Sequence, residues 1–341
     1  MSLIQSLFPA HQEAGAEILP SEGRLPPFDG ATGWLNSEPL TPEGLRGRVV
    51  AVQFWTYTCV NWLRTLPYVR HWAAKYHDHG LTVVGVHTPE FGFERDVDNV
   101  RAAASEITID YPIALDSDYA VWHAFANRFW PALYVADGQG RIRYHHFGEG
   151  EYAMSEMAIQ QLLREAGEEG FDPQLVSVEP QGTEVPADWS NLRTPETYLS
   201  YGRSYGLASP DGGRIGEPYD YPDDPSQLGP NEWAPSGLWM LAGHAAVLEE
   251  APGRIAIRFH ARDVNLVMGP AERGTSVPFR VLLDGEPPGA AHGTDVDERG
   301  NGTVGEQRLY QLIRQPGPIA DRLFEIEFLD SGAEAYCFTF G

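Results

Sequence analysis

The sequence predicts an α/β layered domain followed by an all-β, jelly-roll-like sandwich. Its first half alternates buried β-branched runs with helical periodicity, in the order strand, helix, strand, helical insertion, two strands and helix. A Gly-, Glu- and Pro-rich stretch follows, and short alternating strands take over after it. At 341 residues, two domains are expected. We expect a lead-in over 1–32, the α/β domain over 33–168, a linker over 169–186 and the sandwich over 187–341.

The α/β half is built around the apolar run RVVAVQF at residues 48–54, which predicts a central strand. A three–four spacing of apolar residues then predicts a helix over 62–77. A parallel strand–helix–strand unit needs helices on the sheet faces, which makes this a layered fold. The other predicted elements are a strand over 34–40, a capped turn over 41–45, a strand over 81–86, helices over 93–105 and 118–125, strands over 132–136 and 141–147, and a helix over 154–166.

The second half shows strict alternation at residues 254–260 (RIAIRFH), which is typical of a half-buried strand. In the last strand, alternation places Tyr336, Phe338 and Phe340 on one face and Cys337 on the other. With those aromatics in the core, Cys337 faces outward or toward the first domain. The seven predicted strands cover 245–249, 254–260, 264–268, 277–284, 307–313, 323–328 and 335–340.

Composition limits the partners. A formal charge of −24 repels nucleic acid and anionic membranes, and we expect neither as a ligand. Two cysteines exclude a disulfide framework and a four-cysteine zinc site, and no metal or cofactor is expected. No run of about 18 apolar residues predicts a membrane span. The first 20 residues lack a basic and apolar leader, so we expect a cytoplasmic protein, or an extracytoplasmic one if its start is trimmed. The oligomeric state stays open.

Cys59 lies in the run FWTYTCVNW, where the central strand turns into a helix. A thiolate at a helix N-terminus faces free N–H groups and the positive end of the helix dipole, so we expect its pKa to lie below the usual value. Thiol–disulfide oxidoreductases carry C-x-x-C at such a turn, but the fourth position here is Trp62. Thioredoxins bury an aspartate six residues before the first cysteine, and here that residue is the uncharged Gln53. The second thiol and its base are therefore both absent from the motif.

Three further positions agree with a thioredoxin-type fold. Pro67 lies eight residues after Cys59, where thioredoxins kink the following helix. Trp130-Pro131 precedes a strand, where the fold places a cis-proline beside the cysteine. Phe147-Gly148 ends the last strand, where the fold often has a glycine.

At this level the chain resembles the thioredoxin-like region of DipZ-type proteins, within the TlpA and redoxin group. The resemblance covers about residues 30–341 and implies a thioredoxin-like domain joined to a carbohydrate-binding-module-like sandwich. Members normally keep a full C-x-x-C and are often fused to a membrane electron conduit. The segments that carry the resemblance are FWTYTCVNW, VVGVHTPEFGFE, YPIALDSDYAVW, NRFWPALYVAD and FGEGEY in the first half, and TPETYLSYGR, FHARDVNLV and the final YCFTFG in the second.

The leading functional hypothesis is monothiol redox chemistry with Cys59 as the nucleophile. A thiolate can attack a protein disulfide, a low-molecular-weight thiol adduct or a peroxide. Pro131 shapes the substrate edge in this hypothesis. Arg64 and Arg128 are the nearest candidate cations. Thr56 completes a peroxiredoxin-like T-x-x-C pattern.

A second strand end contributes His87 and Glu90, because ligands gather at the carboxyl ends of parallel strands. Either residue is a candidate proton donor or acceptor for Cys59, and the alternative for His87 is a satisfied strand-end side chain. The pairs His145-His146 and His77, His79 lack the spacing of metal ligands and are expected at the surface.

Several alternatives remain open at this point. Cys59 is either reactive or a buried, inert thiol capped by Trp62. Cys337 is either a distant resolving thiol or a small residue on a strand. A non-catalytic protein would use a groove rimmed by Trp62 and Trp130 to hold a partner. Aromatic residues of the sandwich are candidates for a sugar platform, namely Trp189, Trp233 and Trp239.

Overall fold

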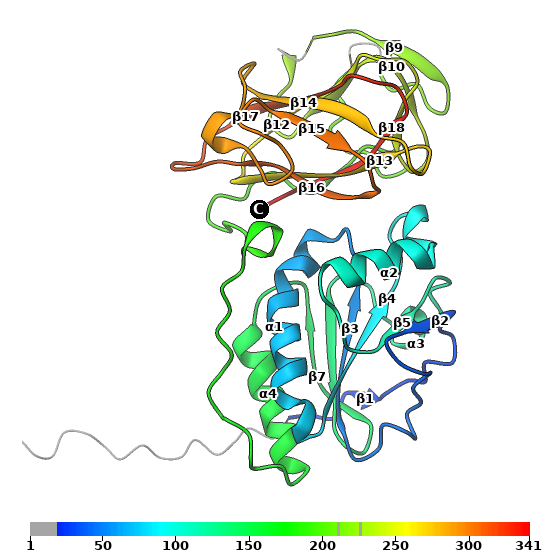
Figure 1. Ribbon diagram of the computed structural model, residues 1–341, viewed down its shortest axis with the longest axis vertical. Coiled ribbons are helices and arrows are strands. Elements are labelled where there is room, and N and C mark those ends of the chain that lie inside the picture. The colour runs from blue at the N-terminus through cyan, green and yellow to red at the C-terminus, as the bar shows by residue number, and fades with distance from the viewer. Residues whose placement is uncertain (1–18, 210–211, 225–226) are drawn as a thin grey trace, which may run out of the picture.

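The computed structural model describes residues 19–209, 212–224 and 227–341, so most of the predicted lead-in lies outside the described residues. The chain forms an α/β unit and an all-β unit stacked end to end, with the last strand running back to the seam between them (Figure 1). Both predicted fold classes are confirmed. No helix in the described part of the chain is both long and apolar enough to cross a bilayer.

The first unit is built on a seven-stranded sheet in the order β1-β7-β6-β3-β4-β5-β2. The central strands β3, β4 and β5 run parallel, and β6 pairs antiparallel with β3. Parallel strands have both faces covered, and the burial of every residue of β3 reflects this. The strands are β1 (Gly23–Arg24), β2 (Gly33–Leu35), β3 (Val49–Trp55), β4 (Leu81–His87), β5 (Ile113–Leu115), β6 (Ala132–Ala136) and β7 (Arg141–Phe147).

Helices cover the two faces of this sheet unequally. On one face, α1 (Val60–Tyr76), α2 (Val97–Glu106) and α4 (Tyr152–Glu165) contribute to one apolar cluster. On the other face, α3 (Ala120–Ala124) packs with Phe28 of the lead-in. The helix α1 begins directly after β3, at the edge of the sheet that faces the all-β unit (Figure 1).

Three details differ from the sequence-based expectations. The helix expected over 93–105 is a short 3-10 turn at Gly92–Arg95 followed by α2, because Asp96 caps a new helix with its side chain. The strand β5 escaped prediction because it has three residues. The lead-in is not wholly irregular, since β1 adds to the sheet edge beside β7.

The second unit is a sandwich whose two sheets share the long strand β10 (Trp233–Leu241). The first half of β10 pairs with β12, and its second half pairs with β9 and β11. Gly237 marks the change, with a φ of 91° and a close approach to the Pro252 carbonyl. The other strands are β8 (Thr197–Tyr198), β9 (Pro218–Tyr221), β11 (Ala246–Leu248), β12 (Gly253–Phe259), β13 (Asp263–Pro270), β14 (Val277–Leu283), β15 (Asn301–Val304), β16 (Arg308–Arg314), β17 (Arg322–Phe328) and β18 (Ala333–Phe340).

The seven strands predicted in this unit correspond to β11–β14 and β16–β18. The longest strand, β10, escaped prediction because Pro235 and Gly237 interrupt its pattern. We keep 33–168 and 187–341 as our proposed division of the chain. The segment between them packs on the first unit, where the Val176 N–H donates to Glu156 of α4 at 2.9 Å.

Candidate functional site

Cys59 is the N-cap of α1 and directly follows the turn at residues 57–58 that comes after β3. Its N–H donates to the Thr56 carbonyl at 3.2 Å, and its carbonyl accepts the first helical bond from Leu63 at 3.0 Å. Its backbone is extended, with φ −75° and ψ 107°, as an N-cap requires. The residue is a free cysteine and is partly exposed. The predicted placement of a thiol at the strand-to-helix turn is therefore what the structure has.

The pKa of this thiol shifts in the direction opposite to the one expected from the sequence. Burial raises the pKa of Cys59 well above its usual value, and the carboxylates of Glu196 and Glu90 raise it further. The N–H groups of Trp62 and Asn61 act in the opposite direction but do not prevail. The prediction of a lowered pKa was wrong because the helix N-terminus is covered by a second domain that brings negative charge to it.

Neither expected cation compensates for this charge. Arg64 is only 1% exposed, and its guanidinium is engaged by the Glu149 carboxylate at 2.8 Å and the Phe340 carbonyl at 3.1 Å. Arg128 is an exposed residue of the loop between α3 and β6. The charged groups with the largest effect on Cys59 are carboxylates.

Trp62 lies inside the domain. It is 0% exposed and stacks on Trp55, with ring centroids 4.4 Å apart. Its indole N–H donates to Gln53 Oε1 at 3.1 Å, and Gln53 Nε2 donates to Thr65 Oγ1 at 2.8 Å. The indole therefore fills the place of the second thiol, and its hydrogen bond uses the side chain that stands where thioredoxins have an aspartate. The expectation that Trp62 rims a groove was wrong, because the first turn of α1 directs it into the core.

Thr56 and His87 form a buried pair under the turn. Thr56 is 0% exposed, and its Oγ1 lies 3.5 Å from His87 Nε2. Burial lowers the pKa of His87 to about 3, so the imidazole is neutral near pH 7. Its ring stacks on Tyr57, with centroids 5.8 Å apart. These contacts favour the satisfied strand-end histidine over the proton donor.

Pro131 is buried, and the Trp130-Pro131 peptide bond is cis, as expected. It precedes β6, in which Ala132 pairs with Phe54 near the end of β3. Trp130 is half-buried and donates its indole N–H to the Thr88 carbonyl at 3.1 Å. The proline and the turn of Cys59 thus lie on neighbouring strands of one sheet edge.

Glu90 connects this edge to the second domain. Its Oε1 accepts from Tyr198 Oη at 2.5 Å and from Arg203 Nη2 at 3.0 Å. The Tyr198 hydroxyl also lies 3.0 Å from a carboxyl oxygen of Glu196, and burial followed by the charge of Glu90 raises the pKa of Glu196 to about 7. The proposed proton acceptor Glu90 is therefore a member of an acidic cluster made by both domains, and it acts on Cys59 through its charge.

The strand β18 turns an unexpected face toward this cluster. Its pairing with β13 shifts register, so that Cys337 pairs with Val267 and Ala335 with Met268 while Tyr336 is left over. Such a bulge puts two successive side chains on one side. Tyr336 therefore leaves the sandwich core and contacts Phe93, with centroids 4.9 Å apart. The prediction that Tyr336 shares a face with Phe338 and Phe340 was wrong for this reason.

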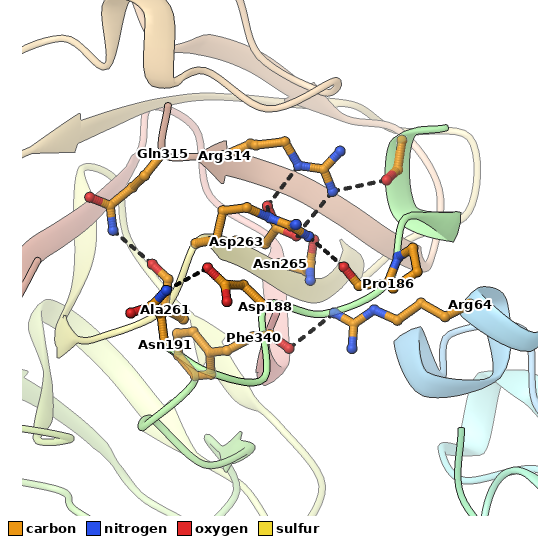
Figure 2. A network of polar contacts seen from close by, with 12 residues as sticks. Arg64, Pro186, Asp188, Asn191, Ala261, Asp263, Asn265, Arg314, Gln315 and Phe340 are labelled. Atoms are coloured by element: carbon orange, nitrogen blue, oxygen red, sulfur yellow. Dashed lines mark hydrogen bonds and ion pairs between the residues drawn. The ribbon is translucent and has the colours of Figure 1, made fainter. Parts of the chain in front are cut away.

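Polar contacts also join the two domains, and Figure 2 shows this region. Arg64 of α1 reaches across to the carbonyl of Phe340 in β18 (Figure 2). Behind that strand, Arg314 of β16 donates to Asp263 of β13 at 2.7 Å, which holds the end of the sandwich that receives Arg64. The two domains are thus joined by apolar packing beside Cys59 and by a buried guanidinium one turn further along α1.

A buried carboxyl that the sequence analysis missed supports the turn. Glu94 is 1% exposed and accepts from Thr58 Oγ1 at 2.6 Å and from the Phe91 N–H at 2.9 Å. Burial raises its pKa to about 7. The signal available in the sequence was a glutamate inside an otherwise apolar, turn-rich segment, which suggests a capping carboxylate only after the 3-10 turn is known.

The other candidates have structural roles or lie elsewhere. Trp233 and Trp239 are 0% exposed and belong to the sandwich core, so they form no sugar platform, whereas Trp189 is 62% exposed. His145 is bonded to Glu22 at 2.7 Å. Within residues 19–209, 212–224 and 227–341, no three His, Cys, Asp or Glu side chains are grouped as a metal ion requires.

Two family models match separate parts of the chain. Residues 22–161 match the family model described as Redoxin. Residues 194–341 match the model described as Thioredoxin like C-terminal domain.

Two curated relatives and one solved structure illustrate the similarity. The chain is 39% identical over 279 residues to protein DipZ of Mycobacterium bovis, which covers 80% of this chain and 38% of DipZ. It is 32% identical over 141 residues to thiol-disulfide oxidoreductase YkuV of Bacillus subtilis, which covers 41% of this chain and 95% of YkuV. A thioredoxin-like protein solved in its oxidised form is 34% identical and matches 42% of this chain and 96% of its own, with a TM-score of 0.39.

Proposed function

Because the chain belongs to the redoxin family of thioredoxin-like proteins, in its DipZ-like form, we propose that Cys59 carries out thiol–disulfide exchange with a protein or low-molecular-weight disulfide. The single observation that supports this most is the position of Cys59. Cys59 is a partly exposed residue with a free thiol at the N-cap position of α1, and cis-Pro131 precedes β6, which pairs with the strand that leads to Cys59. The name of the relative YkuV describes the same class of reaction.

The proposed reaction begins with loss of the Cys59 proton. The thiolate attacks one sulfur of the substrate disulfide, a new Cys59–substrate disulfide forms, and the second half of the substrate leaves as a thiolate that takes up a proton. Because the carboxylates of Glu196 and Glu90 keep the pKa of Cys59 high, the thiol is mostly protonated at neutral pH. Exchange therefore becomes faster as the pH rises.

Dithiol exchange within a C-x-x-C motif has no place in this proposal. The position of the second thiol holds Trp62, which is packed and hydrogen-bonded in the core. A peroxide substrate receives less support than a disulfide, because Thr56 is fully buried and its hydroxyl lies against His87.

A second candidate function is a non-catalytic module that docks a partner, with the redoxin domain as a scaffold. It is favoured by the raised pKa of Cys59 and by the second domain that lies over the turn. Restoring the motif with Trp62→Cys separates the two candidates. Under the exchange proposal the variant gains insulin-reductase activity, and under the scaffold proposal a folded variant stays inactive.

The direct test is the pH profile of alkylation at Cys59. We expect the iodoacetamide rate at this residue to rise about tenfold per pH unit between pH 7 and 9, since the thiolate fraction does so below the pKa. Bis(2-hydroxyethyl) disulfide should form a mixed disulfide at Cys59, detected by peptide mass spectrometry. Cys59→Ser is the control and should remove both signals. A folded wild-type protein in which Cys59 remains a free thiol after this treatment at pH 9, in no disulfide of any kind, would overturn the proposal.

A further inference from the structure

We propose that Cys337 of the sandwich is the resolving thiol for Cys59, so that the redox pair of this chain lies across the two domains. The inference rests on the proposed exchange at Cys59 and adds a second catalytic residue to it. It replaces the C-x-x-C pair with a pair separated by most of the sequence.

The first argument is the direction in which Cys337 faces. Cys337 lies in the apolar cluster of the redoxin domain, whereas its neighbour Phe338 belongs to the sandwich core, as alternation along a strand requires. Cys59 packs against the same cluster. The bulge turns Tyr336 to the same side as Cys337, so that both side chains face this cluster.

The second argument is that both thiols border one acidic cluster. Cys337 pairs in register with Tyr198 of β8, and the Tyr198 hydroxyl is bonded to Glu90 of the redoxin domain. The carboxylates of Glu196 and Glu90 are the leading charges at Cys337, as they are at Cys59.

The third argument is a cleft of about 280 Å³ at the seam. Its walls include Val60 and Asn61, which follow Cys59, and Glu196 and Thr339, of which the latter lies two residues beyond Cys337. The start of α1 beside Cys59 and the strand that carries Cys337 therefore both line this cleft.

Exposure assigns the roles. Cys59 is partly exposed and receives the substrate, while Cys337 is 1% exposed and receives only what Cys59 presents. In the resolving step the Cys337 thiolate attacks Cys59 Sγ of the mixed disulfide, and the substrate leaves as a second thiol. Overall, the substrate disulfide gains two electrons and two protons and becomes two thiols, and the two cysteines lose them and become one disulfide. Both cysteines are free in this structure, which is the reduced state of the pair.

The pair also accounts for the covered turn. Thiols of high pKa are poor leaving groups, so a disulfide between them resists reduction. The oxidised form would bind the two domains covalently at the place where apolar packing already holds them. Access of substrate to Cys59 and closure by Cys337 are then successive steps at one seam.

The experiment uses 5,5′-dithiobis(2-nitrobenzoate) as the disulfide probe on the full chain at pH 8 without denaturant. Wild type should release two thionitrobenzoate anions per chain, lose the protein-bound adduct, and yield a Cys59–Cys337 peptide in non-reducing digests. Cys337→Ser should release one anion and keep a stable adduct at Cys59. Thermal midpoints of the reduced proteins verify that the variant is folded.

The outcomes separate this inference from the function on which it rests. A stable adduct on wild-type Cys59, or a disulfide between two chains on non-reducing gels, overturns the resolving role and leaves exchange at Cys59 standing. Absence of any adduct at Cys59 in folded wild type and in Cys337→Ser overturns both. If Cys337→Ser does not fold, the non-reducing digest of oxidised wild type decides the question alone.

Discussion

The hydrogen bond between Trp62 and Gln53 gives the sharpest test of how the second-thiol position was replaced. Trp62→Phe removes the N–H and leaves Gln53 Oε1 unpaired in a site that is 2% exposed. An unpaired buried acceptor costs about 1–3 kcal/mol. The smaller ring also loses roughly 40 Å² of buried surface, which costs about 1 kcal/mol. We expect the free energy of unfolding to fall by about 2–4 kcal/mol.

The partner variant, Gln53→Leu, removes the acceptor of this hydrogen bond. It leaves the Trp62 N–H unpaired and should lower the free energy of unfolding by about 1–3 kcal/mol. Thr65 keeps a partner in this variant, because its hydroxyl also donates to the Trp62 carbonyl at 2.8 Å. In the double variant neither polar group is left over, so the cost should return to the burial loss of about 1 kcal/mol. The double-mutant cycle should therefore show a coupling of about 2 kcal/mol or more.

Urea unfolding followed by circular dichroism, with linear extrapolation to water, measures these free energies. The control cycle combines Gln53→Leu with Trp239→Phe. Trp239 lies in the sandwich core at 0% exposure, and its indole N–H donates to the Ser236 carbonyl at 2.9 Å. The control pair should be additive within about 0.5 kcal/mol. Additivity in the test cycle as well would refute the claim that Gln53 and Trp62 form one unit.

Three further predictions concern the buried charges. Folding raises the pKa of Glu94 from 4.5 to about 7, so the stabilisation from its bound proton is complete below pH 4.5 and is lost as the pH rises to 7. Urea titrations should therefore show the free energy of unfolding of wild type, relative to Glu94→Gln, falling by about 3 kcal/mol between pH 4.5 and 7 and staying constant above pH 7. Arg64→Met leaves the buried carboxylate of Glu149 without its partner and should lower the free energy of unfolding by about 3–5 kcal/mol. Arg70→Met removes an ion pair whose arginine is 28% exposed and should lower it by less than about 1 kcal/mol. Equal losses would contradict a buried ion pair at Arg64. Glu196→Gln removes the leading charge at Cys59 and should speed its alkylation several-fold at pH 8, and an unchanged rate would argue against that charge.

The first domain was largely predictable because its signals are local. The continuous apolar run of β3 and the three–four spacing in α1 are set by neighbouring residues, and the cis-proline follows from a motif offset. The location of Cys59 at the strand-to-helix turn could be predicted, but the charges and burial around its thiol could not. The pKa of Cys59 depends on Glu196, which lies in another domain and which no local pattern of the first domain could place beside it.

The second domain shows the same limit in its backbone. Alternation assigned the faces of β18 correctly at Phe338 and Phe340 but failed at Tyr336, because a bulge depends on the register with β13 and not on the strand itself. The strand β10 failed for a related reason: Gly237 looks like a breaker in sequence but serves as the corner at which one strand passes between two sheets.

The replaced second cysteine and the orientation of β18 together determine which thiol can act with Cys59. Once an indole fills the core position of the second cysteine, a partner thiol for Cys59 has to come from outside the motif. Sequence alternation places Cys337 opposite Phe338 and leaves open whether it faces outward or toward the first domain, and its packing in the apolar cluster of the redoxin domain selects the second. The carboxylates at the seam then slow the first step by keeping Cys59 protonated, and the apolar packing of Tyr336 keeps the second domain over the turn. If that packing is what holds the two thiols within reach, Tyr336→Ala should lengthen the lifetime of a Cys59 adduct in an otherwise folded chain, while Tyr205→Ala, at a side chain that is 72% exposed, should leave it unchanged.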